Sequence, residues 1–420
     1  MDKTTWYRLD NVGKFYASQA GSPTQTIFRY SATMTDAVNP EDLQHALNRA
    51  LVVYPNFNVR LRSGFFWHYL EQSHDTPLVS LEDIPICHSL HVNEKSVLFR
   101  VSYYKKRINL EISHIISDGR GTLNFFKAFI IAYIQCRYKY QNSEIAPYVT
   151  NKQKIENSFD IHYEKKLAGS TKKPRVYHLK GEKNKLSPTY LEYHTSASQV
   201  LALARTFQVS LTSFFIAAVI CAIRDEMPIR ERNKTIRLDI PVDLRQHFKS
   251  STTKNFFGLT YVEYKPGSYD ESLEIVAKHI QEQLIIGTSP ENLKRRMNQM
   301  IALEKNPFLR FAPAFLKDQV LKIAGRITAG DVTASVSSLG IIDFPEYTLN
   351  HIEDINVTTS PEGINFTACT FKDDLSLGMS TSFTNLSVTR NLCKLFNDLG
   401  IKGRVNISKE DDDEMQRVRN

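Results

Sequence analysis

The sequence predicts an α/β fold made of two halves. Stretches with the spacing of amphipathic helices alternate with stretches that have the two-residue period of strands. The length of 420 residues suits two domains better than one. A lysine-rich stretch, Asn151–Ser187, has few periodic apolar residues and is predicted to cross the surface between the halves. The expected division is therefore 1–160, a crossover at 161–188, and 189–420.

The first half begins its regular structure with a predicted helix over Asn39–Tyr54. Asn39 can cap this helix, Pro40 suits its first position, and leucines recur at helical spacing behind them. The stretch "GFFWHYLE" is expected to form a hairpin strand that packs its aromatic residues, with His68 in a structural role.

Two strands and a helix follow, around the most unusual motif of the chain. "VLFRVSYYKKRINLEIS" predicts two strands joined by a basic turn at Lys105–Arg107. Ile108, Leu110 and Ile112 share one face of the second strand, and His114 continues the same period. The segment Thr122–Tyr138 then has helical periodicity. The motif thus lies in a short loop between a strand and a helix.

The second half is predicted to follow the same alternation of elements. Ser210 is a plausible cap for a very apolar helix, and Glu271–Gln299 is expected to be helical. The charged tail that starts at Lys409 is expected to be solvated. The other predicted elements are, in order, a strand and helix from "TYLEYHTSA", the strands "TIRLDIPVDLR", "NFFGLTYVEY", "VTASVSSLGII" and "GINFTACTFKDDLSLGMSTSF", and a helix "TRNLCKLFNDLG".

The bulk composition excludes several classes of protein. Five scattered cysteines without a CxxC pair argue against a zinc site and a disulfide framework, and Cys369 is expected to be a core residue. The longest apolar run is too short to cross a bilayer, so we expect a soluble, cytoplasmic protein. The net charge of +8 suits a phosphate-bearing partner, but no nucleic-acid-binding motif accompanies it, and a solvated basic surface explains most of the charge.

The candidate site is His114 with Asp118. Among the twelve histidines, only His114 has an aspartate four residues on, followed by a glycine. A histidine at a strand end can face a cleft and act as a general base. The alternative is structural: Asp118 caps the next helix, and His114 is a satisfied core residue.

The order of four motifs resembles the chloramphenicol acetyltransferase-like superfamily. "HIISDG" is followed by "IPVDLR", "KNFFG" and "SVSSLG". This superfamily contains alcohol acetyltransferases, BAHD acyltransferases, polyketide-associated acyltransferases and condensation domains. Ser113 stands where condensation domains usually carry a second histidine, and the DFGWG motif of BAHD enzymes is absent. The resemblance is therefore greatest to the alcohol acetyltransferase-like branch.

The resemblance implies two similar halves, each a mixed sheet flanked by helices, with a tunnel between them that is open on both sides. It implies His114 as general base, with Asp118 turned away from the substrate toward an arginine. Arg245 is the best match for that arginine and Arg60 the second. The motif glycine, Gly119, would support the site.

The remaining candidate residues also depend on the resemblance. Ser337 and Ser338 could donate hydrogen bonds to an oxyanion, or could be ordinary small polar residues of a strand. Asn255 and Gly258 match a stretch that lines the tunnel in relatives, or they belong to the turn before a strand. No metal, no permanently bound cofactor and no nucleophilic serine or cysteine is expected.

The implied function is transfer of an acyl group from acyl-CoA to a hydroxyl or amine of a small molecule, by a monomer. One alternative is a free-standing condensation-type enzyme that uses an acyl carrier protein. Another is a binding module without catalysis, which the intact motif residues disfavour. The sequence leaves open the acceptor, the acyl length, O- versus N-acylation, the choice of donor and the oligomeric state.

Overall fold

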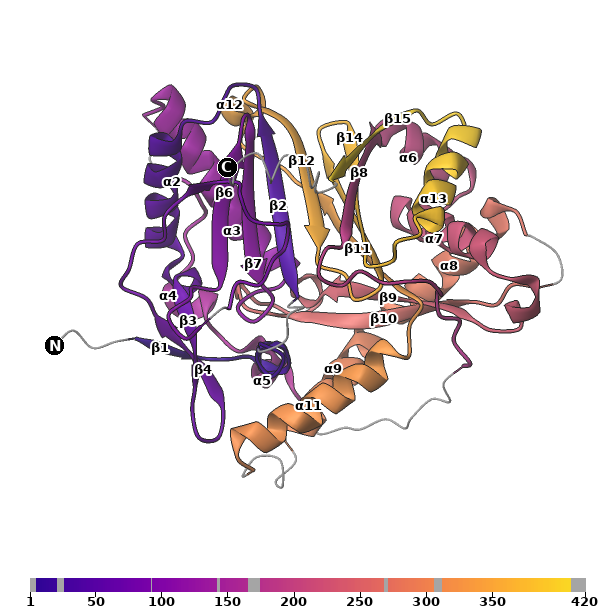
Figure 1. Ribbon diagram of the computed structural model, residues 1–420, viewed down its shortest axis with the longest axis horizontal. Helices are drawn as coiled ribbons and strands as arrows, with labels where there is room; N and C mark the ends of the chain where they lie inside the picture. Colours follow the sequence, from indigo (N-terminus) through magenta and orange to yellow (C-terminus); the bar gives the residue numbers. More distant parts are fainter. Residues whose placement is uncertain are drawn as a thin grey trace.

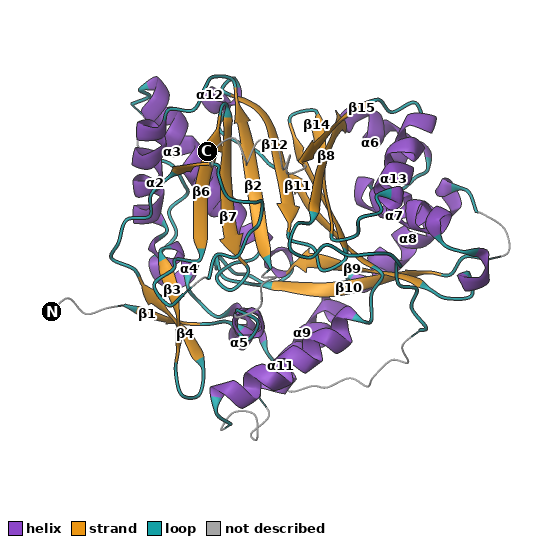
Figure 2. Ribbon diagram, viewed as in Figure 1, coloured by secondary structure: helices purple, strands orange, loops and turns teal. Residues whose placement is uncertain are grey.

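The fold is known from a computed structural model that describes residues 5–20, 26–91, 93–141, 144–164, 174–267, 271–305 and 312–408. The charged tail from Lys409 and residues 165–173 of the predicted crossover lie outside these ranges. Two lobes stand side by side, each a sheet with helices packed against it (Figure 1). The strands of both sheets occupy the middle of the molecule, and helices cover the outer faces on either side (Figure 2).

The first lobe contains the elements that precede the crossover. Its helices are α1 Asn11–Ala17, α2 Pro40–Val53, η1 Pro55–Phe57, α3 Gly119–Tyr138, α4 Asn151–Lys154 and α5 Ser158–His162. Its strands are β1 Trp6–Arg8, β2 Ile27–Met34, β3 Val59–Ser63, β4 His68–Gln72, β5 Ser80–Leu81, β6 Phe99–Tyr104 and β7 Arg107–Ser113. In the described chain, β1, β4 and β3 form a small sheet of their own.

The part of the chain that follows the crossover supplies the second lobe and one strand, β12, of the first lobe's sheet. Its helices are α6 Ala197–Thr206, α7 Leu211–Glu226, η2 Ile229–Glu231, η3 Leu244–Gln246, α8 Leu273–Gly287, α9 Pro290–Glu304, α11 Ala314–Ala329, α12 Glu346–Leu349 and α13 Ser387–Asp398. Its strands are β8 Thr189–Ser196, β9 Ile236–Asp243, β10 Phe257–Tyr264, β11 Ala334–Ile341, β12 Ile352–Thr359, β13 Ile364–Phe371, β14 Asp374–Thr381 and β15 Gly403–Ser408.

The two main sheets are mixed and share chain segments. Within the described residues the larger has the order β10-β9-β11-β13-β14-β8-β15, and the smaller β12-β2-β7-β6-β5. Strand β12 follows the crossover, yet it pairs antiparallel with β2 over Ile352–Thr359. The predicted boundary at residue 189 therefore does not separate the two sheets.

Close packing of the two sheets depends on a glycine. Strand β12 passes so near β14 that a Cβ on Gly378 would lie 2.0 Å from the carbonyl oxygen of Val357. Asn356 of β12 also donates a hydrogen bond to Ser376 of β14, at 2.6 Å. Cys369 is buried here, as expected of a core residue. This contact fixes the second lobe against the first.

Most predicted helices are present, but the one expected over Glu271–Gln299 is interrupted. Helix α8 ends at Gly287, and α9 begins at Pro290. Proline lacks the amide hydrogen that an uninterrupted helix needs, and it suits the first turn of a new one. Helix α11, which the sequence analysis did not predict, follows α9 and lies at the lower edge of the molecule in Figure 1.

The aromatic hairpin differs from its prediction at one point. β3 and β4 pair as expected. However, the residues at their turn, Phe65 and Phe66, are 74% and 48% exposed rather than packed. His68 Nε2 contacts the Asp318 carboxylate of α11 at 3.0 Å, which connects the hairpin to that helix.

Candidate active site

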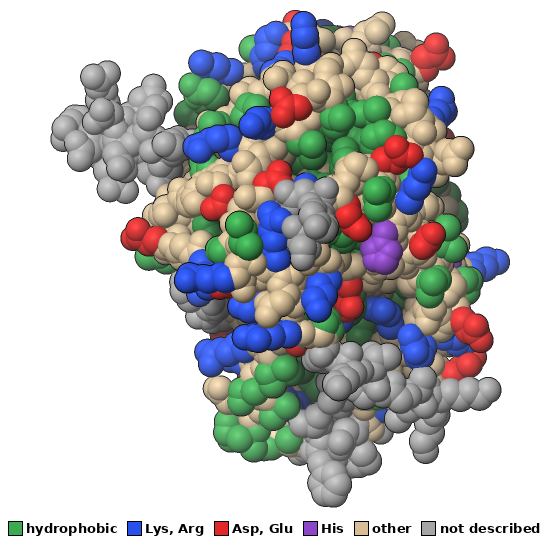
Figure 3. Space-filling view, turned by 90° about the vertical axis from the view of Figure 1, so that its right-hand side faces the viewer, with side chains coloured by type: hydrophobic (Ala, Val, Ile, Leu, Met, Phe, Trp, Pro, Cys, Tyr) green, Lys and Arg blue, Asp and Glu red, His purple; other side chains and the backbone are tan. Residues whose placement is uncertain are grey.

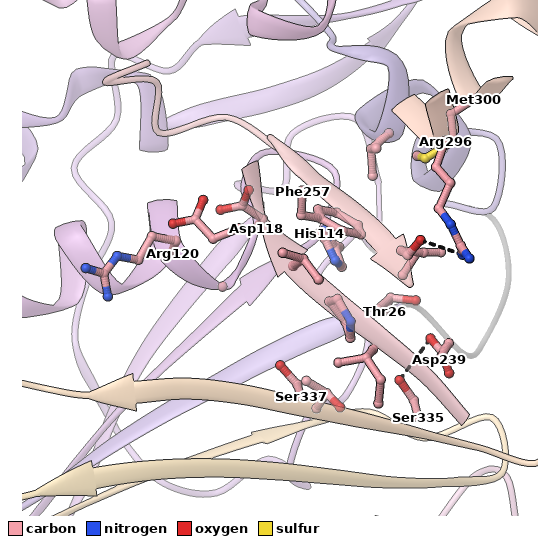
Figure 4. A pocket seen from close by; sticks show the side chains of 18 of the residues that line it. Thr26, His114, Asp118, Arg120, Asp239, Phe257, Arg296, Met300, Ser335 and Ser337 are labelled. Carbon is pink, nitrogen blue, oxygen red and sulfur yellow. Dashed lines mark hydrogen bonds between the residues drawn. The ribbon is translucent and has the colours of Figure 1, made fainter. Parts of the chain in front are cut away.

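His114 lies at the junction of the lobes, directly after β7. Its side chain is buried, and it lines a cavity of about 1410 Å³ whose wall comes from both lobes. Tyr16 stacks on the imidazole with ring centroids 4.2 Å apart, and Phe28 and Phe257 contact it at 4.5 and 5.4 Å. Figure 4 shows His114 and Phe257 together in the middle of the pocket. The ring orientation is therefore fixed by aromatic packing.

Asn255 determines which imidazole nitrogen is free. Its Nδ2 lies 3.1 Å from Asp10 Oδ2 and 3.1 Å from the carbonyl oxygen of His114, and both atoms can only accept hydrogen bonds. Asn255 Oδ1 must then face His114 Nδ1, at 2.7 Å, and accept a hydrogen bond from it. The proton is thus assigned to Nδ1, which leaves the lone pair of Nε2 available to substrate.

Burial keeps His114 neutral. Loss of solvation lowers the pKa of His114 to about 4, although Asp118 and Asn255 act in the opposite direction. At neutral pH the imidazole therefore carries no extra proton and can accept one. A second buried histidine, His194, shows the opposite state. Burial alone would lower its pKa, but the hydrogen bond to Asp374 and the Glu192 carboxylate, 3.8 Å from Nε2, raise it to about 9.

Asp118 combines the two roles that the sequence analysis weighed against each other. Its Oδ1 accepts a hydrogen bond from the Gly121 amide at 2.8 Å and so caps helix α3. Its Oδ2 accepts from Arg245 Nη1 at 2.9 Å and from the Phe256 amide at 2.6 Å. The carboxylate and the guanidinium are both nearly inaccessible to solvent, with side-chain exposures of 5% and 10%. Asp118 is therefore a helix cap and half of a buried ion pair.

Arg245 holds the segment that carries Asn255. Besides Asp118, it contacts Asp243 at 2.9 Å. It donates to the carbonyls of Thr252 at 2.9 Å and Lys254 at 2.5 Å. A Cβ on Gly121 would lie 2.1 Å from the Thr253 carbonyl oxygen, so glycine is needed where this segment meets α3. The contacts connect the motif aspartate to the residue that orients His114.

The other predicted residues divide into two groups. Gly119 lines the cavity, and its carbonyl accepts a 2.6 Å hydrogen bond from the Tyr30 hydroxyl. Arg60 pairs with Asp75 instead of Asp118, and it is not among the described residues that line the cavity. Neither Asn255 nor Gly258 is among them.

The position of Gly258 follows from strand geometry. Successive residues of β10 point to opposite sides, so Phe257 and Leu259 line the cavity while Gly258 faces Leu244. Asn255 precedes the strand and lies behind the imidazole. Asn255 therefore does not line the cavity, but its contact with His114 brings it into the site.

Ser337 and Ser338 line the cavity where the large sheet opens. Strand β11 pairs with β9 only through Ala334 and Ser335, and beyond this point it pairs with β13 alone. Gly340, with a φ of +69°, takes a left-handed conformation just beyond a register shift. The strand edge at the two serines is thus turned toward the cavity.

Asp239 is a partly buried acid of the cavity wall that the sequence analysis missed. Its Oδ2 accepts a hydrogen bond from Ser335 at 3.1 Å, whereas its Oδ1 has no partner among the described residues. Burial raises the pKa of Asp239 to about 6. Figure 4 shows it beside Ser335, on the same side of the pocket as Ser337. Strand periodicity placed Asp239 opposite the buried isoleucines of β9, but nothing nearby in the sequence marked it as a site residue.

A group of cations occupies another part of the cavity wall. Arg237 and Arg296 lie over the Tyr261 ring, 4.2 and 5.1 Å from its centroid, and Arg295 also lines the cavity. Burial lowers the pKa of Arg296, and repulsion from Arg295 and Arg237 adds to this. On the face in Figure 3, Lys and Arg side chains are scattered among Asp and Glu.

The described residues contain neither a candidate metal site nor a single helix that could span a membrane. In the described ranges, no group of three or more His, Cys, Asp or Glu side chains is arranged to hold a metal ion. Among the described helices, none alone is long and apolar enough to span a bilayer, and the pair α6 and α7, which together pass that test, is bent by 87°.

Comparison with known proteins gives no match to a protein-family model and none to a curated protein. Solved structures do match. The polyketide synthase associated protein 5 of Mycobacterium tuberculosis has a TM-score of 0.60 at 13% identity, over 94% of this chain and all of that one. TRI101 of F. graminearum, complexed with coenzyme A and T-2 mycotoxin, has 0.63 at 14%, over 96% and 99%.

Condensation domains have the same fold. The starter condensation domain of rhizomide synthetase RzmA matches with a TM-score of 0.56 at 10% identity, over 94% of this chain and 96% of that one. The chain therefore has the two-lobed fold that these structures share, among them TRI101 with coenzyme A, the trichothecene 15-O-acetyltransferase TRI3 and a starter condensation domain.

Proposed function

We propose that this protein transfers an acyl group from acyl-CoA to a small-molecule acceptor, with His114 as general base. The observation that carries the proposal is the imidazole itself: neutral, locked by Asn255 with its Nε2 unprotonated, and exposed to a large cavity between the lobes. The shared fold with CoA-binding acetyltransferases supports this assignment.

The chemistry requires two proton transfers and no covalent enzyme intermediate. His114 Nε2 takes the proton from the acceptor O–H as its oxygen attacks the thioester carbonyl carbon. The tetrahedral oxyanion would be stabilised by donors at the edge of β11, where Ser337 and Ser338 face the cavity. When the C–S bond breaks, the imidazolium returns its proton to the thiolate. The products are the acylated acceptor and free CoA.

The cationic group fits the donor. Arg237, Arg295 and Arg296 gather positive charge around Tyr261 in the cavity wall, and a guanidinium is suited to paired hydrogen bonds with phosphate oxygens. We assign the phosphates of coenzyme A to this group. The thioester arm of a carrier protein has one phosphate and no adenosine, so it would make fewer contacts with these arginines.

Asp239 favours a hydroxyl over an amine as the acceptor. With a pKa of about 6, this carboxyl is mostly ionised at pH 7. An ionised carboxylate stabilises the ammonium form of a nearby amine, which cannot attack a carbonyl. The unpartnered Oδ1 can instead accept a hydrogen bond from a second hydroxyl of the acceptor.

The test is a transfer assay that detects both products. Purified protein is mixed with acyl-CoAs of increasing chain length and a panel of alcohols and amines, and acylated products and free thiol are quantified by mass spectrometry and a thiol reagent. We expect ester formation with equal release of CoA. Equal rates with an acyl-pantetheine thioester that lacks the nucleotide would favour the carrier-protein alternative, and no transfer with any donor would leave a binding module.

A further inference from the structure

Helix α11 carries an apolar stripe on its exposed side. The stripe residues are spaced at i, i+4, i+7 and i+11, which places them along one line of an α-helix about 24 Å long. A surface helix normally turns such a stripe toward the core, but here it faces solvent. Its members and their exposures are Leu316 48%, Val320 44%, Ile323 56% and Ile327 60%.

The aromatic hairpin extends this surface. The Ala314 amide donates to the Phe65 carbonyl, and Lys317 Nζ donates to the Phe66 carbonyl, both at 2.9 Å, so the turn between β3 and β4 is held at the start of α11. Figure 1 shows the hairpin tip and α11 at the same lower edge. We define the apolar face as the exposed residues Phe65, Phe66, Phe315, Leu316, Val320, Ile323 and Ile327.

The charges of α11 are sorted around the stripe. Lys322 and Arg326 each precede a stripe residue by one position and so flank it on one side. The acid of the same helix, Asp318, is turned inward to His68. An exposed apolar stripe bordered by cations is the pattern of helices that lie in the interface of an anionic bilayer.

The apolar face continues into the cavity. Val320 belongs to the stripe and also lines the cavity that contains His114. Leu321, Ala324 and Thr328, on the adjoining side of the helix, line it too. Lys317 of α11 also lines the cavity, with its Nζ held by the Phe66 carbonyl. An apolar molecule on this face would therefore reach the cavity wall through Val320 and its apolar neighbours on the helix.

We propose that the apolar face docks on the surface of a lipid bilayer that contains anionic lipids, and that the cavity takes up a lipid-soluble substrate there. The docking depends on the exposed residues alone. The uptake rests on the proposed function, and it assigns the acceptor, or the acyl chain of the donor, to the class of membrane-dissolved molecules. Lipid fits this face better than a second copy of the chain because of the flanking cations: a self-complementary contact would bring Lys322 and Arg326 of two copies near each other.

The docking is tested by flotation of the full-length protein with vesicles of phosphatidylcholine alone or mixed with phosphatidylglycerol. We expect binding to the mixed vesicles that weakens as salt is added. Ile323→Glu with Ile327→Glu should lower the partition coefficient ~10- to 100-fold, because two isoleucines no longer enter the interface. Matched controls are Val52→Glu and Ile229→Glu, which alter residues 81% and 84% exposed elsewhere and should leave binding unchanged.

The result separates docking from catalysis. Neither Ile323 nor Ile327 is among the described cavity residues, so the double variant should retain transfer to a water-soluble alcohol. Vesicle binding without transfer activity would refute the proposed function and leave docking intact. Lack of binding by the natural protein, or equal losses in the control variants, would refute docking. A dimer in ultracentrifugation that the double variant converts to monomer would assign the face to a second copy.

Discussion

The buried pair of Asp118 and Arg245 makes a prediction in which the two roles of the aspartate can be measured separately. Replacing Asp118 with alanine removes both the helix cap and the ion pair. Asparagine at the same position retains an oxygen that can cap α3, but it presents no charge to Arg245. Replacing Arg245 with methionine removes the cation and keeps most of the side-chain volume.

The magnitudes follow from the contacts. Loss of the cap bond to Gly121 costs ~1 kcal/mol in stability. Breaking a buried ion pair costs about 3–5 kcal/mol. Arg245 would keep Asp243 at 2.9 Å and its backbone carbonyl partners, so the lower end of that range applies. We therefore expect a loss of about 3 kcal/mol for Asp118→Asn and about 4 kcal/mol for Asp118→Ala.

The assay is a double-mutant cycle on stability, measured by thermal and urea unfolding. Asp118→Asn combined with Arg245→Met should be less harmful than the sum of the single changes by about 1–3 kcal/mol. The control cycle uses Glu274 and Lys278, an exposed pair 2.7 Å apart on α8, for which a coupling of ~0.3–0.5 kcal/mol is expected.

Two results would refute this reasoning. Additive losses in the cycle would mean that Asp118 and Arg245 do not stabilise one another. Equal losses for Asp118→Asn and Asp118→Ala would mean that the cap bond contributes nothing.

Three further predictions concern orientation, pH and the donor. Asn255→Ala should lower kcat by ~10-fold or more, because the proton on His114 Nδ1 loses its acceptor. The control Asn109→Ala also removes a buried amide and should affect stability alone. Equal losses of kcat in the two variants would contradict the role of Asn255 in orienting His114. The free energy of unfolding should fall by about 3 kcal/mol as pH rises from ~6.5 to ~9, because the folded state holds a proton on His194 that the unfolded state has released. If a His194→Gln variant loses as much stability over the same pH range, His194 is not the cause. Arg296→Ala should raise the KM for acyl-CoA and make this KM less dependent on salt. The control Arg390→Ala on α13 should leave the KM and its salt dependence unchanged. Both are measured by steady-state kinetics at several ionic strengths.

Local patterns in the sequence predicted most elements around the site. The strand before His114 and the helix after Asp118 are present because period and capping chemistry act over a few residues. The pairing of Asp118 with Arg245, 127 residues apart, came from the order of motifs rather than from any local pattern. Arg60 was the second candidate for the partner of Asp118, but it lies on β3 of the small sheet and pairs with Asp75.

Contacts between distant segments could not be predicted. Asp10 reaches Asn255 across 245 positions, and periodicity says nothing about which loops meet. β12 leaves its own half to pair with β2, since a strand pattern does not identify its partner sheet. The exposed stripe of α11 has the same spacing as a buried one, so burial could not be inferred from it.

Single-turnover transfer by His114→Ala shows whether His114 accepts the acceptor's proton. Enzyme in excess over a labelled acyl-CoA is mixed with a reactive alcohol, and ester and free CoA are followed in time. His194→Ala is the control, because it removes another buried histidine that is not among the described cavity residues. We expect a ~100- to 10,000-fold slower reaction for His114→Ala, with the protein still folded. A His114→Ala protein that forms ester at the rate of the natural protein would contradict it.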